Sequence, residues 1–528
     1  MYAPQIAETD PDRPCFVMAS TGETVTYGEF EARANRFAHL LRDHGLRRLD
    51  HYSIFMENDP RYLEACGAGE RAGLYYTCVN SHLTADELAY ILTNSESRVL
   101  VASRALCDTA LDAVAQSPGI ELVLVVDKPD GVGDALDVPV LDFVAATEPF
   151  PATPIADERL GTPMLYSSGT TGRPKGIVRD LPDVPPSDQL PLFHFLIQLW
   201  RYRDGMRYLS PAPLYHSAPQ AAVGLTVRMG GTAVIMERFD PETYLELIER
   251  HQITHSQLVP TMFSRMLKLP EEARTRHDLS SLEIAVHAAA PCPVQVKEQM
   301  IDWWGPIIHE YYGATEAIGF SACDSEEWLA HKGTVGKVIV GTLHVLDEEG
   351  QPCVTGEPGT LWFEPPTSLS YFNDDEKTAE STMVDPNVAD VPLATTGDVG
   401  YVDEDGYLYL TDRRTFMIIS GGVNIYPQET EDLLITHPKV ADAAVFGVPN
   451  VDLGEEVKAV VQPMPDIAHD DALRTELMQF CLDHLSKQKC PRSIDFDPEL
   501  PRLPTGKLYK RVLRDRYWGD GASRIVST

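Results

Sequence analysis

The sequence predicts an α/β protein: a large N-terminal domain of doubly wound sheets plus a β subdomain, followed by a small mobile α+β C-terminal domain. Three observations predict this class. The chain has 528 residues, strand-like runs alternate with capped helices in its first half, and short strands dominate after about residue 330. A single core rarely grows past about 300 residues, so several domains are expected. Alternating strands and helices indicate a parallel sheet with ligand loops at its strand ends.

Two helices of the N-terminal part begin at capping boxes. Thr26 is followed three residues later by Glu29, and Thr84 by Glu87. In this pattern the threonine hydroxyl and the glutamate carboxylate satisfy backbone N–H groups of the first helical turn. The residues behind the first cap that recur at helical spacing, and so predict a buried face, are Phe30, Ala34, Phe37 and Leu41.

Short apolar runs between the helices predict strands. Runs at 99–101, 122–126 and 232–236 fit this description, and Asp240 with Pro241 after the last of them predicts a helix N-terminus. The segment Val178–Pro191 holds four prolines and three aspartates, which predicts an exposed loop.

The chain changes character after about residue 330. Tyr407–Leu410 behind the turn Asp405-Gly406 is typical of the short strands of a β subdomain. A compact α+β unit is expected from Phe416 onward. Its predicted elements are a strand at 417–419, a helix from Pro427 to about His437, and strands near 443–448 and 457–461.

The charge balance limits the possible partners. The chain carries 44 basic and 79 acidic side chains, which gives a formal net charge of −35. This excess of negative charge argues against nucleic acid or anionic lipid as the main partner. A site for an anionic substrate must therefore gather its positive charge locally.

Cysteine usage and the apolar segments predict a cytoplasmic location. Nine cysteines without a CxxC pair indicate reduced thiols, most of them buried. Residues 1–13 lack the basic start and the apolar core of a signal peptide. The most apolar stretch, 190–200, is too short to span a bilayer, so no stable membrane insertion is expected.

Residues 165–177, LYSSGTTGRPKGI, form the most distinctive motif. The run does not match a P-loop, because Pro174 stands where the second glycine must precede Lys175. Backbone N–H groups, hydroxyls and the ammonium of Lys175 behind a strand-like 164–166 could nevertheless converge on a polyphosphate. Taken by itself, the run is also compatible with an ordinary serine- and glycine-rich turn.

Further motifs follow the loop in a fixed order. They are 307–316 (IIHEYYGATE), 396–398 with 412–413 and 420–424, and 503–507 (LPTGK). Together with the loop they resemble the adenylate-forming superfamily over nearly the whole chain. The resemblance is strongest to actinobacterial acyl-CoA synthetases that act on fatty, steroid or terpenoid acids.

The resemblance implies that the enzyme activates a carboxylic acid with ATP and Mg²⁺ and passes the acyl group to coenzyme A. Thr315 would contact the α-phosphate, and Glu316 would bind Mg²⁺, a cation that prefers oxygen ligands. The residues that would hold the β- and γ-phosphates are Ser167, Ser168, Gly169, Thr170, Thr171, Gly172 and Lys175. The residues that would hold the nucleoside are Tyr312 and Gly313, Ala289, Ala290 and Pro291 on the other side of the adenine, and Asp398 and Arg413 at the ribose.

Two further residues take their roles from the resemblance. A lysine near a C-terminus is usually a solvated charge, but the window 502–516 around Lys507 holds six basic residues against one acid. The family's equivalent lysine bridges the carboxylate and the α-phosphate, so Lys507 is expected to be catalytic. His216 lies at the family's gating position beside the acid and the thiol tunnel, without an acid–base role. A histidine bonded to backbone groups under a loop is the alternative for this position.

The resemblance also predicts the domain boundary. Residues 1–412 would bind AMP and the acid, and residues 413–528 would form the mobile domain, with the hinge near 412–415. That domain must swing to exchange Lys507 for the thiol-binding face that carries Gly421 and Gly422. The hinge residue, commonly aspartate or lysine in the family, is Thr415 here, so the efficiency of the coenzyme A half-reaction stays open.

The substrate and the competing functions are less constrained. His287 and the small side chains of 288–290 are expected to border the acid pocket, which favours a bulky hydrophobic acid. One alternative is an adenylating enzyme that hands acyl-AMP to a carrier protein or a partner enzyme. A non-catalytic binding protein is disfavoured by the intact motif residues. A GxSxG elbow and a GxGxxG fingerprint are missing, which argues against a hydrolase and a dehydrogenase. The identity of the acid, the pathway and a possible homodimer stay open.

Overall fold

The structure is a computed structural model that describes residues 3–133, 136–167, 174–188, 191–385, 388–413, 416–420, 423–465, 467–502 and 508–518. Contacts between Cα atoms divide the chain into two compact units. The first comprises Met1–Gln257, His277–Ile284 and Ser370–Thr378, and the second comprises Leu258–Arg276, Ala285–Leu369 and Ala379–Thr528. The domain boundary predicted at residue 412 stays a prediction.

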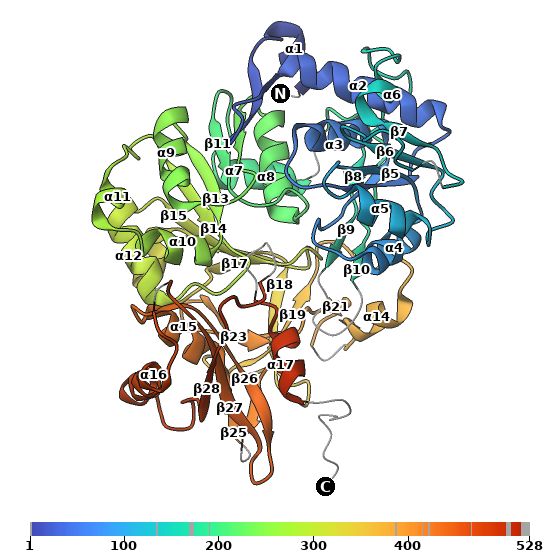
Figure 1. Ribbon diagram of the computed structural model, residues 1–528. Coiled ribbons are helices and arrows are strands. Elements are labelled where there is room, and N and C mark those ends of the chain that lie inside the picture. The colour runs from blue at the N-terminus through green and yellow to red at the C-terminus, as the bar shows by residue number, and fades with distance from the viewer. Residues whose placement is uncertain are drawn as a thin grey trace. The chain divides into compact units, whose positions relative to one another are not determined.

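The first unit contains a six-stranded parallel sheet of the predicted kind, with strand order β7-β6-β5-β3-β4-β8. Strands β5, β6, β7 and β8 of this sheet are labelled in Figure 1. On one face, Leu88 and Ile91 of helix α4 and Ala110 of helix α5 pack with the strand residues Leu100 and Val123. The strands are β3 (His51–Phe55), β4 (Tyr75–Cys78), β5 (Ser97–Ala102), β6 (Leu122–Val125), β7 (Val140–Asp142) and β8 (Thr162–Pro163). The helices between them are α3 (Pro60–Ala72), α4 (Ala85–Asn94), α5 (Cys107–Val114) and α6 (Phe143–Thr147).

A second group of strands in this unit has the order β13-β11-β12-β1-β2, parallel except at β2. A two-stranded hairpin of β9 and β10 completes its sheets. The strands are β1 (Pro14–Met18), β2 (Thr24–Thr26), β9 (Leu165–Ser167), β10 (Lys175–Ile177), β11 (Arg207–Ser210), β12 (Thr232–Ile235) and β13 (His255–Leu258). The helices are α1 (Ala3–Thr9), α2 (Tyr27–Asp43), α7 (Pro191–Leu199), α8 (Ser217–Arg228) and α9 (Pro241–His251).

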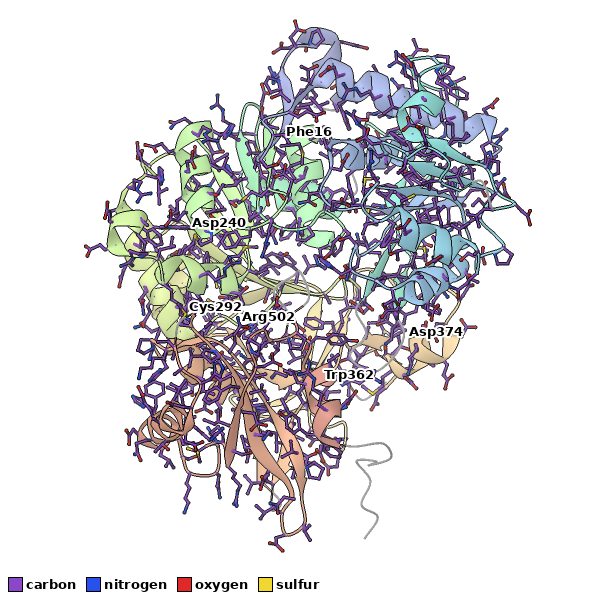
Figure 2. The ribbon with its side chains drawn as sticks, in the orientation of Figure 1. Phe16, Asp240, Cys292, Trp362, Asp374 and Arg502 are labelled. Carbon is purple, nitrogen blue, oxygen red and sulfur yellow. The ribbon has the colours of Figure 1, made fainter. Side chains whose placement is uncertain are left out.

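The predicted helix starts are confirmed at the level of hydrogen bonds. Thr26 and Glu29 at the start of α2 exchange both bonds of a capping box, and so do Thr84 and Glu87 at α4. Asp240, labelled in Figure 2, accepts a hydrogen bond of 2.9 Å from the backbone N–H of Thr243 and caps α9. The predicted core face of α2 is buried. Local sequence patterns therefore determine where these helices begin.

The loop prediction for Val178–Pro191 needs a correction. Residues 178–188, the part before α7 that the structure describes, contain no helix or strand, as expected. The segment is not uniformly exposed, however, because Leu181 and Pro186 are buried. Both terminal nitrogens of the Arg228 guanidinium donate to the carbonyl oxygen of Pro186, over 3.0 and 2.6 Å. A buried cation thus anchors a segment whose proline and aspartate content resembles that of a solvated loop.

The second unit begins with a sheet section in which β14 and β15 are parallel and β16 and β17 follow antiparallel. Its strands are β14 (Ile284–His287), β15 (Ile308–Gly313), β16 (Phe320–Cys323) and β17 (Lys337–Val340). The helices are α10 (Pro260–Leu267), α11 (Glu271–Thr275), α12 (Val294–Trp304) and α13 (Ser325–Ala330).

The predicted β subdomain is a sheet of order β20-β21-β19-β22-β23, with β18 paired to β19. Its strands are β18 (Thr342–Leu346), β19 (Gly359–Glu364), β20 (Thr382–Met383), β21 (Leu393–Ala394), β22 (Asp398–Val402) and β23 (Leu408–Arg413), and α14 spans Asp375–Glu380.

The C-terminal α+β part is built on a sheet of order β25-β24-β27-β26, with β28 paired to β27. Its core joins Ile418, Val445 and Ala459 of the sheet to Leu434 of α15 and Leu477 of α16. The strands are β24 (Ile418–Ser420), β25 (Val423–Ile425), β26 (Val440–Asn450), β27 (Gly454–Pro463) and β28 (Ser493–Phe496). The helices are α15 (Gln428–Thr436), α16 (Asp471–His484) and α17 (Lys510–Trp518). Among the helices that the structure describes, none is long and apolar enough to cross a membrane.

Candidate active site

The predicted ribose position is the best-defined part of the site. The phenolic hydroxyl of Tyr312, at the end of β15, donates a hydrogen bond of 2.8 Å to Oδ2 of Asp398, the first residue of β22. The hydroxyl of Thr396 donates to the same oxygen, also over 2.8 Å. Asp398 is only 8% exposed, so these bonds fix the orientation of its carboxylate.

The backbone of Arg413 is placed beside this carboxylate by strand register. Asp398 and Arg413 are direct partners in the antiparallel pair of β22 and β23. Residues at paired positions of an antiparallel ladder lie about 5 Å apart at their Cα atoms. The fold therefore brings together three of the predicted nucleoside residues, Tyr312, Asp398 and Arg413, from three different strands.

The other predicted adenine contacts follow β14. Because β14 and β15 are parallel neighbours, Ala289–Pro291 and Tyr312-Gly313 lie at the same edge of the sheet. Ala289 is exposed and has a φ of +73°, a left-handed conformation that costs free energy for any residue with a Cβ. Strain of this kind is often kept at ligand-binding loops. The positive φ of Ala289 could not be predicted from the sequence, since alanine rarely adopts a positive φ.

Thr315 and Glu316 lie in a turn directly after β15. The backbone N–H of Ala317 donates to the carbonyl oxygen of Ala314 over 2.9 Å, which closes the turn around the two residues. Both side chains are half-buried. Among the described residues, no cluster of three or more histidine, cysteine, aspartate or glutamate side chains could hold a metal ion by itself. Glu316 alone would have to be completed by phosphate and water oxygens, which is how Mg²⁺ is usually held beside a nucleotide.

The base of the predicted phosphate loop is a β-hairpin. Ser167 and Lys175 are direct partners across β9 and β10, and the ammonium of Lys175 lies 4.5 Å from the centre of the Tyr371 ring. Gly176 packs closely, because a Cβ there would lie 2.6 Å from the terminal methyl carbon of Met164 and 3.1 Å from the Tyr166 ring. Ser168, Gly169, Thr170, Thr171 and Gly172 lie outside the described residues.

His216 is the residue before α8, and its Nε2 atom is buried without a hydrogen-bond partner among the described residues. The expectation of a histidine bonded to backbone groups is therefore not met at this nitrogen. Burial, with a smaller contribution from His82, lowers the pKa of His216 to about 3. The ring is therefore neutral near pH 7.

Three predicted site residues lie outside the described part of the chain, namely Lys507, Gly421 and Gly422. Their roles stay predictions. Cys292, labelled in Figure 2, directly follows Pro291, and burial raises the pKa of its thiol well above the ordinary value. This direction is opposite to the lowered pKa of an activated cysteine.

One charged cluster close to the site was not predicted. Lys297 of α12 and Glu310 of β15 form a buried ion pair of 2.5 Å, and Nε2 of His287 lies 3.4 Å from the same Glu310 oxygen. Burial is the largest single effect and raises the pKa of Glu310, but the charges and hydrogen bonds of Lys297 and His287 together outweigh it, so the pKa falls to about 2. The available signal was a glutamate within the largely apolar strand run 307–312, since a buried charge requires a partner.

Comparisons with known proteins agree with these motifs. The family model of the AMP-binding enzyme matches residues 4–371, and that of the AMP-binding enzyme C-terminal domain matches residues 429–507. The chain is 30% identical to the long-chain-fatty-acid–CoA ligase FadD13 of Mycobacterium tuberculosis (strain ATCC 25618 / H37Rv), over 97% of each protein. It is also 30% identical to the medium/long-chain-fatty-acid–CoA/3-oxocholest-4-en-26-oate–CoA ligase of Mycolicibacterium smegmatis, over 96% of this chain and 94% of the relative.

A solved structure extends the likeness to the fold. The o-succinylbenzoate coenzyme A synthetase MenE from Bacillus subtilis, in complex with AMP, superposes with a TM-score of 0.76 at 26% identity. The superposition covers 97% of this chain and 98% of that structure. The chain therefore belongs to the AMP-binding enzyme family, and within this adenylate-forming superfamily to the acyl-CoA synthetases, which are AMP-forming acid–thiol ligases.

Proposed function

We propose that this acyl-CoA synthetase acts on a bulky hydrophobic carboxylic acid and uses Mg²⁺ together with ATP. In the first step a carboxylate oxygen attacks the α-phosphorus of ATP, the bond to the β-phosphate oxygen breaks, and pyrophosphate leaves. In the second step the thiol of coenzyme A attacks the acyl carbonyl, AMP leaves, and the thiol proton passes to solvent. Both steps depend on positioning and charge neutralisation more than on covalent help from the protein.

The hydrogen bond between Tyr312 and Asp398 is the observation that carries the proposal. It links the ring proposed to stack on adenine to the carboxylate proposed to accept hydrogen bonds from the ribose hydroxyls. The strained Ala289 and the register partner Arg413 support the same placement of a nucleoside. The nucleotide would thus be held by residues whose positions are set by strand pairing.

Positive charge at the phosphates would come from Lys175 and from Mg²⁺. Lys175, at the base of the hairpin, would neutralise the leaving pyrophosphate, and Thr315 would contact the α-phosphate. Glu316 would hold Mg²⁺, whose chemistry is to neutralise phosphate charge and to fix the geometry of the leaving group. In a chain with a net charge of −35, such local gathering of positive charge is a condition for binding ATP.

Lys507 would reach the same centre from residues 413–528, which we propose as the mobile domain. After adenylation that domain would swing about residues 412–415 and present Gly421 and Gly422 to the thiol. Lys507 would then serve only the first step. Thr415 absorbs the backbone change in this account, since a hinge needs conformational freedom rather than a particular side chain.

Small side chains near the site support a bulky acid. Ala289 and Ala290 leave room at the edge of β14. Relatives reported above act on long-chain fatty acids and on a steroid acid by name. We therefore propose a long-chain or fused-ring acid as the substrate of this chain.

The acid class is tested by pyrophosphate release over a panel of acids, each with and without coenzyme A. The panel contains acetate, a long-chain fatty acid and a polycyclic acid. Burial of apolar surface contributes ~25 cal/mol per Å², so the polycyclic acid should exceed acetate in kcat/KM by orders of magnitude. Ala290→Phe should reduce the rate with bulky acids more than the rate with acetate, and both are measured at saturating ATP because Ala290 is also proposed to border the adenine. Ala290 suits this test because it is half-buried, whereas the buried Ala288 would be overpacked. A wild-type preference for acetate would refute the proposed class.

A further inference from the structure

Lys297, Glu310 and His287 form a buried cluster of polar side chains that is centred on one carboxylate. Lys297 and His287 are 0% exposed and Glu310 is 5% exposed. Both partners approach the same Oε2 atom of Glu310, Lys297 at 2.5 Å and His287 at 3.4 Å. The ammonium of Lys297 also lies 4.8 Å from the centre of the buried Trp328 ring. The carboxylate is therefore the centre to which the other two side chains converge.

The three residues bracket the proposed adenine segment, residues 288–293. His287 is the last residue of β14 and precedes the segment directly, whereas Lys297 lies in the first turns of α12, which follows it. Glu310 is the register partner of His287 on β15. One carboxylate on β15 thus contacts the chain on both sides of the segment.

The same carboxylate is close to the other proposed adenine contact. Glu310 and Tyr312 are two residues apart in β15, so their side chains share one face and their Cα atoms are separated by ~7 Å. Tyr312 in turn donates to Asp398. A shift at Glu310 would consequently be transmitted to both walls of the adenine site, the segment 288–293 and the Tyr312 ring.

A buried ion pair is a weak source of stability, because desolvation of both charges offsets their attraction. Well-packed apolar residues at 297 and 310 would serve a purely structural role at least as well. The hydrogen bond from Lys297 to Glu310 is directional, and it supplies a defined geometry that apolar packing does not enforce.

We propose that Glu310 is a positioning residue of the nucleotide site: by holding Lys297 and facing His287 it clamps segment 288–293 against β15, and so sets the gap between Ala289 and Tyr312. The inference rests on the proposed roles of Ala289 and Tyr312 in binding adenine. It assigns no contact between the cluster and the nucleotide itself.

The test is the affinity for AMP, measured by calorimetry, together with the melting temperature. The main variant is Lys297→Met with Glu310→Gln, which removes the pair without leaving a lone buried charge. A displaced binding wall should weaken AMP binding roughly 10-fold or more. The control is Arg71→Met with Glu31→Gln, which removes a similarly buried ion pair of 2.6 Å between α3 and α2. Whatever its effect on the melting temperature, this control should leave AMP affinity within about twofold of wild type.

Three results would overturn the inference. In the first, the main variant shows a cooperative melting transition, and so is folded, yet it binds AMP as wild type does. In the second, the control variant loses as much affinity for AMP as the main variant. The third result is that wild type itself fails to bind AMP. That result would also refute the proposed function, whereas the first two would refute only the positioning role of Glu310.

Discussion

Tyr312 donates a hydrogen bond to Asp398 over 2.8 Å, although 86 residues separate them in the chain. The bond links the end of β15 to the start of β22, two strands that belong to different sheets of the second unit. A tyrosine that orients a nearly buried carboxylate leaves the aromatic ring and the carboxylate in a fixed relation. Such a fixed relation is what recognition of a nucleoside, with its flat base and its ribose hydroxyls, requires.

Asp398→Ala should raise the KM for ATP by on the order of 100-fold, because each hydrogen bond to a charged group contributes ~1.5–3 kcal/mol. Tyr312→Phe, which keeps the ring and removes only the hydroxyl, should raise it less. The check is steady-state kinetics with ATP varied and the acid saturating. Equal KM values for wild type and Asp398→Ala would show that the carboxylate does not contact the ribose.

Glu316→Gln should shift the Mg²⁺ concentration for half-maximal adenylation upward, because a neutral amide is a poor ligand for a hard cation. The measurement is a Mg²⁺ titration of pyrophosphate release, with removal of the metal by a chelator as the zero point. Glu326→Gln, on the short helix α13, is the matched control and should titrate like wild type. Wild-type behaviour of Glu316→Gln at low Mg²⁺ would mean that Glu316 is structural.

Lys507→Ala should slow adenylation by ~10²–10³-fold, which corresponds to the loss of one donor at a developing charge. Thioester formation from a supplied acyl-adenylate should be nearly unaffected, because the lysine serves only the first conformation. Both half-reactions are measured separately by rapid quench, with the exposed Lys487→Ala as control. An equal loss in both half-reactions would contradict the proposed domain swing.

His216 should make stability depend on pH. Its pKa is about 3 in the folded protein because of burial, below the ordinary value of 6.5. The unfolded chain therefore binds a proton near pH 6.5 while the folded protein does not, so the stabilising effect is complete above that pH and declines toward pH 3. Between pH 6.5 and 5 the loss amounts to ~2 kcal/mol.

The check compares melting temperatures at pH 7 and pH 5. The decrease should be smaller for His216→Gln than for wild type, whereas the exposed His194→Gln should behave like wild type. If His216→Gln and wild type lose the same amount, the buried neutral ring does not contribute to the pH dependence.

Much of the fold could be predicted because its signals are local. The pairs Thr26–Glu29 and Thr84–Glu87 define helix starts through contacts three residues apart, and the structure confirms both. The segment around Leu181 and Pro186 shows the limit of such reasoning. Its burial depends on Arg228, a residue about 40 positions later in the chain, and composition within the segment does not report a distant partner.

For the site, the motifs predicted which residues take part but not the contacts between them. Tyr312 and Asp398 were both predicted through motifs, but their direct hydrogen bond depends on the pairing of distant strands. The positive φ of Ala289 was invisible, because only glycine or asparagine would have suggested it. Lys297 has the sequence context of a solvated helical lysine, and only the buried acceptor Glu310 distinguishes it.

The central claim is that the chain joins a carboxylic acid to coenzyme A through an acyl-adenylate. The most direct test is a single-turnover reaction of the enzyme with ATP, Mg²⁺ and a polycyclic or long-chain acid, quenched before and after addition of coenzyme A. The account predicts that acyl-AMP and pyrophosphate form in equal amounts first, and that coenzyme A then converts the acyl-AMP to acyl-CoA and AMP. Acyl-AMP that persists in the presence of coenzyme A would contradict the account and would favour an adenylating enzyme that serves a carrier protein or a partner enzyme.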